Sequence, residues 1–155
     1  METILITGAS GFLGSCLLNQ LISLGKYQLF TLSRSKEQLQ EKYEGAQGLK
    51  HFDLNDFHQN KMEFDKIDTI IHCAFARAIK GGSSIGESLE FSRMLFEKAK
   101  SSHINSIINI STQEVYGKAS PPWKESMVVD PQTVYGFAKY YSELMAMNLF
   151  DDHNT

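Results

Sequence analysis

The sequence predicts an α/β fold in which a parallel sheet carries helices on both faces. Short apolar runs that fit buried strands alternate with longer segments of helical periodicity along the 155 residues. The first such run, Thr3–Thr7, passes through a glycine-rich turn into a segment with leucines at helical spacing. The connections between successive strands are of the length that right-handed crossovers use, which makes the sheet parallel. We therefore expect one domain spanning residues 1–155.

Composition and charge narrow the class of protein. With 42% apolar residues the chain can bury a proper core, and a net charge of -3 with both signs scattered does not favour a nucleic-acid partner. No apolar run is long enough to span a membrane and no signal peptide precedes the first strand, so we expect a soluble, cytoplasmic protein that acts on a small molecule. Cys16 and Cys73 both fall in apolar settings and are expected to be core thiols.

Glycines at positions 8, 11 and 14 follow the first strand and predict a phosphate-binding turn. The first turn of a helix has unpaired N–H groups and a partial positive charge, and glycines let a pyrophosphate approach them. Gly14 would also let the helix pack closely on the strand. A plain surface turn is the alternative, but the glycines lie between a buried strand and a helix marked by Leu13, Leu17, Leu21 and Leu24.

The end of the second strand bears on the choice of cofactor. This strand is expected over residues 27–32, after a helix stop at Gly25. In dinucleotide-binding folds an acidic residue about 20 positions beyond the glycine turn binds the ribose 2′-OH, whereas an arginine accommodates a 2′-phosphate. Ser33 and Arg34 occupy this place and no carboxylate does, which favours NADP. The alternative is that Arg34 is only a solvated charge in a loop.

The third strand, expected over residues 49–52, ends in Asp53 and Leu54. Before it, Ser35 and Gln38 have the spacing of a capping box for a short polar helix. The carboxyl end of a strand in an open parallel sheet lies near the ligand crevice. Two roles stay open for Asp53: a hydrogen bond to an adenine amino group, or a cap on the turn that follows.

The fourth and fifth strands are expected over residues 68–74 and 107–110, with a glycine- and serine-rich loop at about 80–86 and then a helix to about residue 100. His72 in the fourth strand is expected to be packed or bonded to the backbone. No second histidine or carboxylate is spaced to share a metal with it, so we expect no metal site.

Two later segments carry residues suited to acid/base chemistry. Ser111 and Thr112 stand at the carboxyl end of the fifth strand, and Tyr135 and Lys139 lie four residues apart, on one face of a helix. A phenol with a pKa near ~10 is a poor acid/base at neutral pH unless a nearby cation stabilises the phenolate. Lys139 is placed to supply that charge, although aromatic residues at helical spacing usually serve packing.

Together, the glycine turn, the Asp53-Leu54 pair, the segment 111–117 and residues 135–139 resemble the extended short-chain dehydrogenase/reductase family. More narrowly, they are similar to its NAD(P)-dependent nucleotide-sugar epimerase/dehydratase branch, in family order and over nearly the whole chain. The resemblance implies a Rossmann-like three-layer sheet of strand order 3-2-1-4-5. Members of the family continue beyond the tyrosine helix, so a chain ending at Thr155 is expected to lack the last strands and the substrate domain.

The resemblance also implies residue roles. Thr112 would hydrogen-bond the substrate oxygen, with Ser111 able to share that role, and Tyr135 would be the general acid/base. Lys139 would lower the pKa of Tyr135 and hold the nicotinamide ribose of NADP or, alternatively, NAD. The residues expected to touch the cofactor are Gly8, Ser10, Gly11, Phe12, Leu13, Gly14, Ser33, Arg34, Asp53, Leu54, Ala74, Tyr135 and Lys139.

The chain departs from the family pattern at three places. Ser88 stands where the family often has asparagine, and residues 73–75 replace a run of small residues. Gln113 and Glu114 keep only the second carboxylate of the pair found in dehydratases, which disfavours sugar 4,6-dehydration. We expect Glu114 to be a solvated loop residue.

Three kinds of function stay open. One is an oxidoreductase or epimerase acting on a nucleotide sugar or a related carbonyl compound; the others are a non-catalytic dinucleotide-binding module and an inactive fragment completed by another chain. The joint presence of Thr112, Tyr135 and Lys139 favours enzyme ancestry. By resemblance, the helices at about 87–101 and 133–150 would form a homodimer interface, unless a second chain completes the sheet at its unpaired fifth strand.

Overall fold

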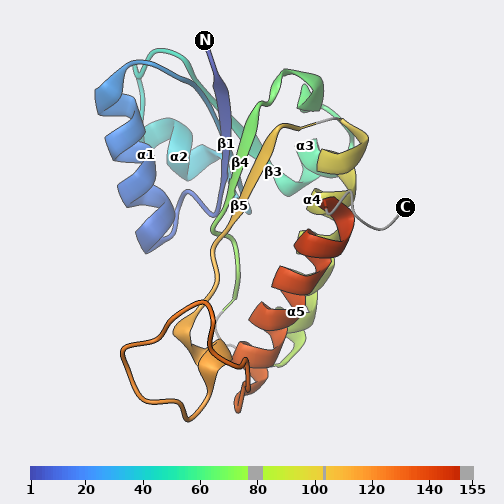
Figure 1. Cartoon of the computed structure of the whole chain (residues 1–155). Coiled ribbons are helices and arrows are strands. Elements are labelled where there is room, and N and C mark those ends of the chain that lie inside the picture. The colour runs from blue at the N-terminus through green and yellow to red at the C-terminus, as the bar shows by residue number, and fades with distance from the viewer. Residues whose placement is uncertain (77–81, 103, 151–155) are drawn as a thin grey trace. The chain divides into compact units, whose positions relative to one another are not determined.

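A computed structural model describes residues 1–76, 82–102 and 104–150 (Figure 1). The chain divides into two compact units. The first consists of Met1–Ala74 with Ser101–Ile108, and the second of Phe75–Lys100 with Asn109–Thr155.

The first unit is built on a parallel sheet whose strand order is β3-β2-β1-β4-β5, as the sequence predicts. β1 runs between β2 and β4, with Leu5 opposite Phe30 on one side and Ile70 on the other. All five residues of β1 are buried, which is typical of a central strand covered on both faces. The strands are β1 (Thr3–Thr7), β2 (Gln28–Ser33), β3 (Leu49–Asp53), β4 (Thr69–His72) and β5 (Ser106–Asn109).

Helix α1 (Phe12–Leu24) turns only part of the predicted leucine stripe to the core, since Leu21 packs against the core and Leu17 is half-buried. Its buried residues are Gly14 and Leu18, whereas Leu13 and Leu24 are 41% and 45% exposed. The buried face of α1 starts at Gly14, because the first turn of the helix lies directly against the end of β1, where only a glycine fits. The C-terminal stop at Gly25 is confirmed, since this residue has a left-handed backbone and its N–H donates to Ile22 O.

The face that α1 buries also corrects the assignment of Cys16. This thiol is exposed on α1, not in the core, because its position two residues after Gly14 faces away from the sheet. Cys73, just after β4, is half-buried.

The capping box predicted at Ser35 is wrong. Helix α2 (Glu37–Lys42) has Lys36 as its N-cap with no side-chain cap, and the Ser35 hydroxyl donates to the Glu37 carboxylate. A capping box does form one helix later, at α3 (Leu54–His58).

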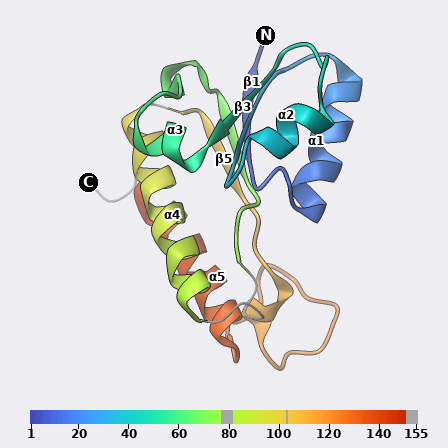
Figure 2. The same ribbon diagram turned by 180° about the vertical axis from the view of Figure 1, so that it is seen from behind.

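The second unit contains two long helices, α4 (Gly82–Ser101) and α5 (Val134–Phe150), which run side by side in both views (Figure 2). The loop predicted at about 80–86 is helical from Gly82 onward, and residues 80 and 81 lie outside the described residues. Tertiary packing outweighs the weak helix propensity of the glycines and serines there, because Ile85 is buried at the start of α4. Among the described residues, 3-10 turns form η1 (Phe64–Lys66) in the first unit and η3 (Gln113–Tyr116) in the second.

Within the described ranges, no helix is both long and apolar enough to cross a membrane.

Replacing Gly14 with alanine is expected to lower the free energy of unfolding by about 1–3 kcal/mol, because the new methyl group would lie 2.3 Å from Gly8 O. The control is Gly86→Ala inside α4, where a Cβ meets nothing within 4 Å and should stabilise the helix by about 0.5–1 kcal/mol. Urea unfolding of the chain measures both changes. A Gly14→Ala variant as stable as the parent would contradict the close packing of α1 on β1.

Candidate functional site

The glycine turn between β1 and α1 is packed so tightly that neither Gly8 nor Gly14 leaves room for a Cβ. Gly8 has a φ of +69°, and a Cβ on it would lie 2.8 Å from Ala74 N. Gly11 is the N-cap of α1 without a side-chain cap, and the first turn of the helix holds no acidic residue. The N–H groups of that turn are therefore not taken up by side chains and can serve an anionic ligand.

Hydrogen bonds fix this turn to the neighbouring strand ends. Gly8 N donates to Leu32 O at 3.0 Å on β2. A hydrogen bond of 2.7 Å joins Thr7 Oγ1 to His72 Nδ1, and Ala74 N donates to Thr7 Oγ1 at 3.3 Å. His72 is thus packed, as the sequence predicts, and its ring is hydrogen-bonded to a hydroxyl group on β1. The carboxyl ends of β1, β2 and β4 are held as one rigid frame.

Arg34, just after the end of β2, is a cation without a partner among the described residues. Ser33 is buried and its hydroxyl donates to Ser35 O at 2.6 Å, so a local turn occupies it. Arg34 is exposed, and within the described part of the chain it has no hydrogen bond or ion pair. Its guanidinium is available to an external anion.

Lys36 is a member of this region that the sequence reasoning missed. Its Nζ lies 2.6 Å from Asp56 Oδ2 and 3.2 Å from Asp53 Oδ2. The hydrogen bond with Asp56 raises the pKa of Lys36 and lowers that of Asp56. Because the carboxylates belong to a helix start some twenty residues further along, no local pattern pointed to Lys36.

Asp53 takes the capping role of the two that the sequence left open. It is the N-cap of α3, and its carboxylate accepts from Asp56 N at 2.8 Å, while Asp53 N donates to Asp56 Oδ2 at 3.2 Å. The pKa of Asp53 is lowered, first by that backbone N–H and then by Lys36. Leu54 follows as the first residue of α3, and an adenine contact through Asp53 stays a prediction.

In the second unit, Thr112 and Ser111 have different environments. Thr112 is half-buried and is the N-cap of η3, where its Oγ1 accepts from Glu114 N at 3.3 Å. Ser111 is exposed, and its hydroxyl donates to the Glu143 carboxylate on α5. Of the two hydroxyl groups, Thr112 is the one that no carboxylate occupies.

Tyr135 and Lys139 occupy one face of α5, as predicted, and both contact Phe75. The rings of Tyr135 and Phe75 meet edge to face with centroids 5.9 Å apart. The Lys139 ammonium lies 4.4 Å from the Phe75 ring centroid, and Lys139 is only 2% exposed. A ring face stabilises a cation that has lost its water, so Phe75 helps to keep a buried charge one helical turn from the phenol.

Ser88 is also engaged where the family pattern has asparagine. Its hydroxyl accepts from Ala76 N at 2.9 Å and donates to Ser84 O at 2.8 Å. The side chain therefore ties the segment that carries Phe75 to α4.

Glu114 is not a solvated loop residue. It is half-buried within η3, and its carboxylate accepts a hydrogen bond from Thr133 Oγ1.

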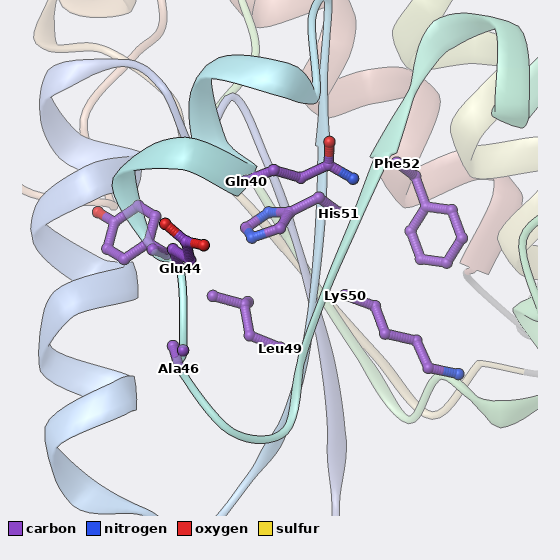
Figure 3. A pocket seen from close by; sticks show the side chains of 9 residues that line it. Gln40, Glu44, Ala46, Leu49, Lys50, His51 and Phe52 are labelled. Atoms are coloured by element: carbon purple, nitrogen blue, oxygen red, sulfur yellow. The ribbon is translucent and has the colours of Figure 1, made fainter.

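A hollow of about 440 Å³ lies elsewhere, beside the edge strand β3 (Figure 3). His51 points to the same side of β3 as Gln40 and Glu44, while Lys50 and Phe52 point to the other. His51 Nδ1 is hydrogen-bonded to Thr31 Oγ1 at 2.7 Å, and burial lowers the pKa of the imidazole. None of the predicted site residues lines this hollow. In the described ranges, no group of three side chains is placed to hold a metal ion.

Solved structures share the fold of this chain. A dTDP-glucose 4,6-dehydratase from Streptomyces venezuelae, solved with NAD, matches 98% of the chain at 24% identity and a TM-score of 0.83. A UDP-glucuronic acid 4-epimerase from Bacillus cereus, also solved with NAD, matches 97% of it at 22% identity and a TM-score of 0.79. The chain spans about half of these proteins, 52% and 53% of their lengths.

Among curated protein sequences, none matches the chain significantly. The sequence model of the NAD-dependent epimerase/dehydratase family, in contrast, matches residues 4–155, which is nearly the whole chain. With the strand order, the glycine turn and the α5 tyrosine and lysine in place, the chain belongs to the NAD-dependent epimerase/dehydratase family.

Proposed function

We propose that this chain is the cofactor-binding part of an NAD(P)-dependent oxidoreductase or epimerase that acts by hydride transfer on a nucleotide sugar or a related carbonyl or hydroxyl compound. The observation that carries the proposal is the buried Lys139, held against Phe75 one turn from Tyr135, in a chain of this family. If Tyr135 and Lys139 served packing alone, the ammonium group of Lys139 would be expected at the surface. Here the charge is withdrawn from water next to a phenol, which suits acid/base use of that phenol.

The residues of the glycine turn fit a dinucleotide. Gly8 and Gly14 leave no room for a Cβ, and the start of α1 is not capped by any side chain, so the pyrophosphate of the cofactor would be held by backbone N–H groups. When bound, the nicotinamide would supply or accept the hydride. Phe12 and Leu13, which lie exposed in the first turn, would flank the cofactor together with Ser10 and Ala74.

The chain's own residues would handle the proton. The Tyr135 hydroxyl would give a proton to, or take one from, the substrate oxygen, and the Lys139 charge would stabilise the phenolate. The half-buried Thr112 hydroxyl would hold the same oxygen in place.

NADP is the cofactor that the end of β2 favours. The Ser33 hydroxyl is bonded to Ser35 O, and β2 itself ends without a carboxylate that could bind a ribose 2′-OH. Asp53, opposite Ser33 on β3, is already paired with Lys36. The exposed Arg34 offers a bidentate donor to a 2′-phosphate.

NADP is therefore expected to bind more tightly than NAD, and Arg34→Ala should weaken NADP binding by about 10- to 100-fold while changing NAD binding little, because one charge-assisted hydrogen-bonded pair is lost. Calorimetric titration of the chain with each dinucleotide measures this. Lys26→Ala, which removes an exposed cation just after the C-terminal end of α1, is the control. Equal or tighter NAD binding by the parent chain would contradict the role of Arg34.

Tyr135→Phe is expected to lower turnover by about 10²- to 10⁴-fold in a longer or reconstituted active form, because the proton-transferring hydroxyl is lost. Cofactor affinity should stay nearly intact. Tyr140→Phe removes the same atom from a tyrosine five residues further along α5 and should retain turnover. Steady-state kinetics and a dinucleotide titration separate the two effects, and retained turnover in Tyr135→Phe would remove that residue from its role.

We further propose that α4 and α5 form the interface of a homodimer. Val134, Phe137 and Tyr141 follow one another at helical spacing on α5 and are 68%, 58% and 56% exposed. An apolar stripe of this kind is typical of a helix that packs against a partner. A second chain that completes the sheet is the alternative, and a cytoplasmic location stays a prediction of the sequence.

The parent chain is expected to sediment as a dimer, and Phe137→Glu should shift it to a monomer because a charge would be buried in an apolar contact. The matched control is Val128→Glu, which alters an 84% exposed apolar residue in the loop before α5. Sedimentation equilibrium at several concentrations distinguishes the species. A monomeric parent chain at every concentration would rule out this interface.

A further inference from the structure

One residue, Glu114, connects the two parts of the second unit that carry the proposed chemistry. Glu114 N donates to Thr112 Oγ1 at 3.3 Å, and Glu114 Oε2 accepts from Thr133 Oγ1 at 2.5 Å. Thr112 and Thr133 are separated by twenty residues of turn and loop. Glu114 therefore contacts both, through its backbone on one side and its carboxylate on the other.

Thr133 controls the start of α5. Its Oγ1 accepts from Gly136 N at 2.9 Å, and its carbonyl oxygen accepts from Phe137 N at 2.9 Å, so it acts as the N-cap of the helix. The threonine hydroxyl has one proton to donate, and that proton goes to Glu114. Glu114 thus sets the rotamer of the residue that caps the helix, two positions before Tyr135.

The backbones around this contact leave little freedom. A Cβ on Gly136 would lie 2.9 Å from Glu114 O, and one on Gly117 would lie 2.0 Å from Asp130 O. Asp130 N also donates to Val115 O at 2.9 Å. Both ends of η3 therefore touch the chain just before α5 or in its first turn, and the carboxylate of Glu114 meets the Thr133 hydroxyl at that junction.

A second tie lies on the other side of Thr112. Asn109 Nδ2 donates to Ser142 Oγ at 3.2 Å, and the Ser111 hydroxyl donates to Glu143. The segment that carries Thr112 is thus bonded to α5 both before and after it. Movement of this segment relative to Tyr135 would have to break one of these ties.

We propose that Glu114 is a positioning residue, which sets the place of Tyr135 relative to Thr112 through the Thr133 cap instead of exchanging protons itself. The inference rests on the proposed function for the roles of Thr112 and Tyr135. Its carboxylate is already an acceptor for the Thr133 hydroxyl, and what it supplies is geometry. Glutamine at this position can supply the same acceptor, whereas it cannot supply an acid or a base.

Amide hydrogen exchange of Gly136 in the chain without ligands tests the structural step. Thr133→Val and Glu114→Ala should each speed this exchange about fivefold, the usual effect of losing one N-cap contact, and the double variant should be no faster than Thr133→Val alone. Glu114→Gln and Thr133→Ser should stay within about twofold of the parent. Unchanged exchange at Leu18 in α1 shows that a variant has folded, and Glu125→Ala, an exposed residue of the preceding loop, is the matched control.

Turnover of a longer or reconstituted active form tests the functional step. Glu114→Ala and Thr133→Val should lower kcat by a similar factor of about 10 to 100, with little change in KM for the cofactor, and Glu114→Gln and Thr133→Ser should restore it. If Glu114→Gln loses as much kcat as Glu114→Ala while Thr133→Val is active, Glu114 transfers a proton and the proposal is wrong. A parent protein that neither binds a dinucleotide nor turns over would refute the proposed function, and the exchange of Gly136 would still decide whether Glu114 holds the cap.

Discussion

The packing of strand ends around the carboxyl end of β1 depends on two positions, Gly8 and Gly14, at which no Cβ fits. Gly8 adopts a left-handed backbone between the ends of β2 and β4, and Gly14 brings the first turn of α1 onto the Gly8 carbonyl. These approaches let α1 bury Leu18 against β1 while its first turn stays free of side-chain caps. The same packing that stabilises the sheet thus prepares a backbone surface for phosphate.

A comparable use of glycine organises the second unit. Gly117 and Gly136 let the η3 turn and the start of α5 approach each other backbone to backbone. At that junction the Thr133 hydroxyl donates a hydrogen bond to the Glu114 carboxylate. In the same unit, Lys139 is buried with its charge over the Phe75 ring. The ring face of Phe75 stabilises this buried ammonium, whose charge would serve the Tyr135 phenol in the proposed function.

The charged cluster at the ends of β2 and β3 stabilises the fold and leaves a neighbouring cation available to a ligand. Lys36 and the two carboxylates compensate one another, which leaves Arg34 as the cation without a partner among the described residues of this edge. Asp53 caps α3 through one carboxylate oxygen and meets Lys36 through the other. Replacement of either acid would therefore disturb α3 as well as the neighbouring turn.

The sequence by itself determined the glycine turn and the placement of Tyr135 and Lys139 on one helix face, because each of these follows from local periodicity or from spacing within one element. The strand order followed from the family resemblance, since no periodicity within one element fixes it. Only the tertiary structure decided which face of α1 is buried and which acids Lys36 meets. It also decided that Phe75 lies against both α5 residues and that Glu114 reaches Thr133. These facts depend on where residues far apart in the chain come together, and no local pattern encodes such contacts.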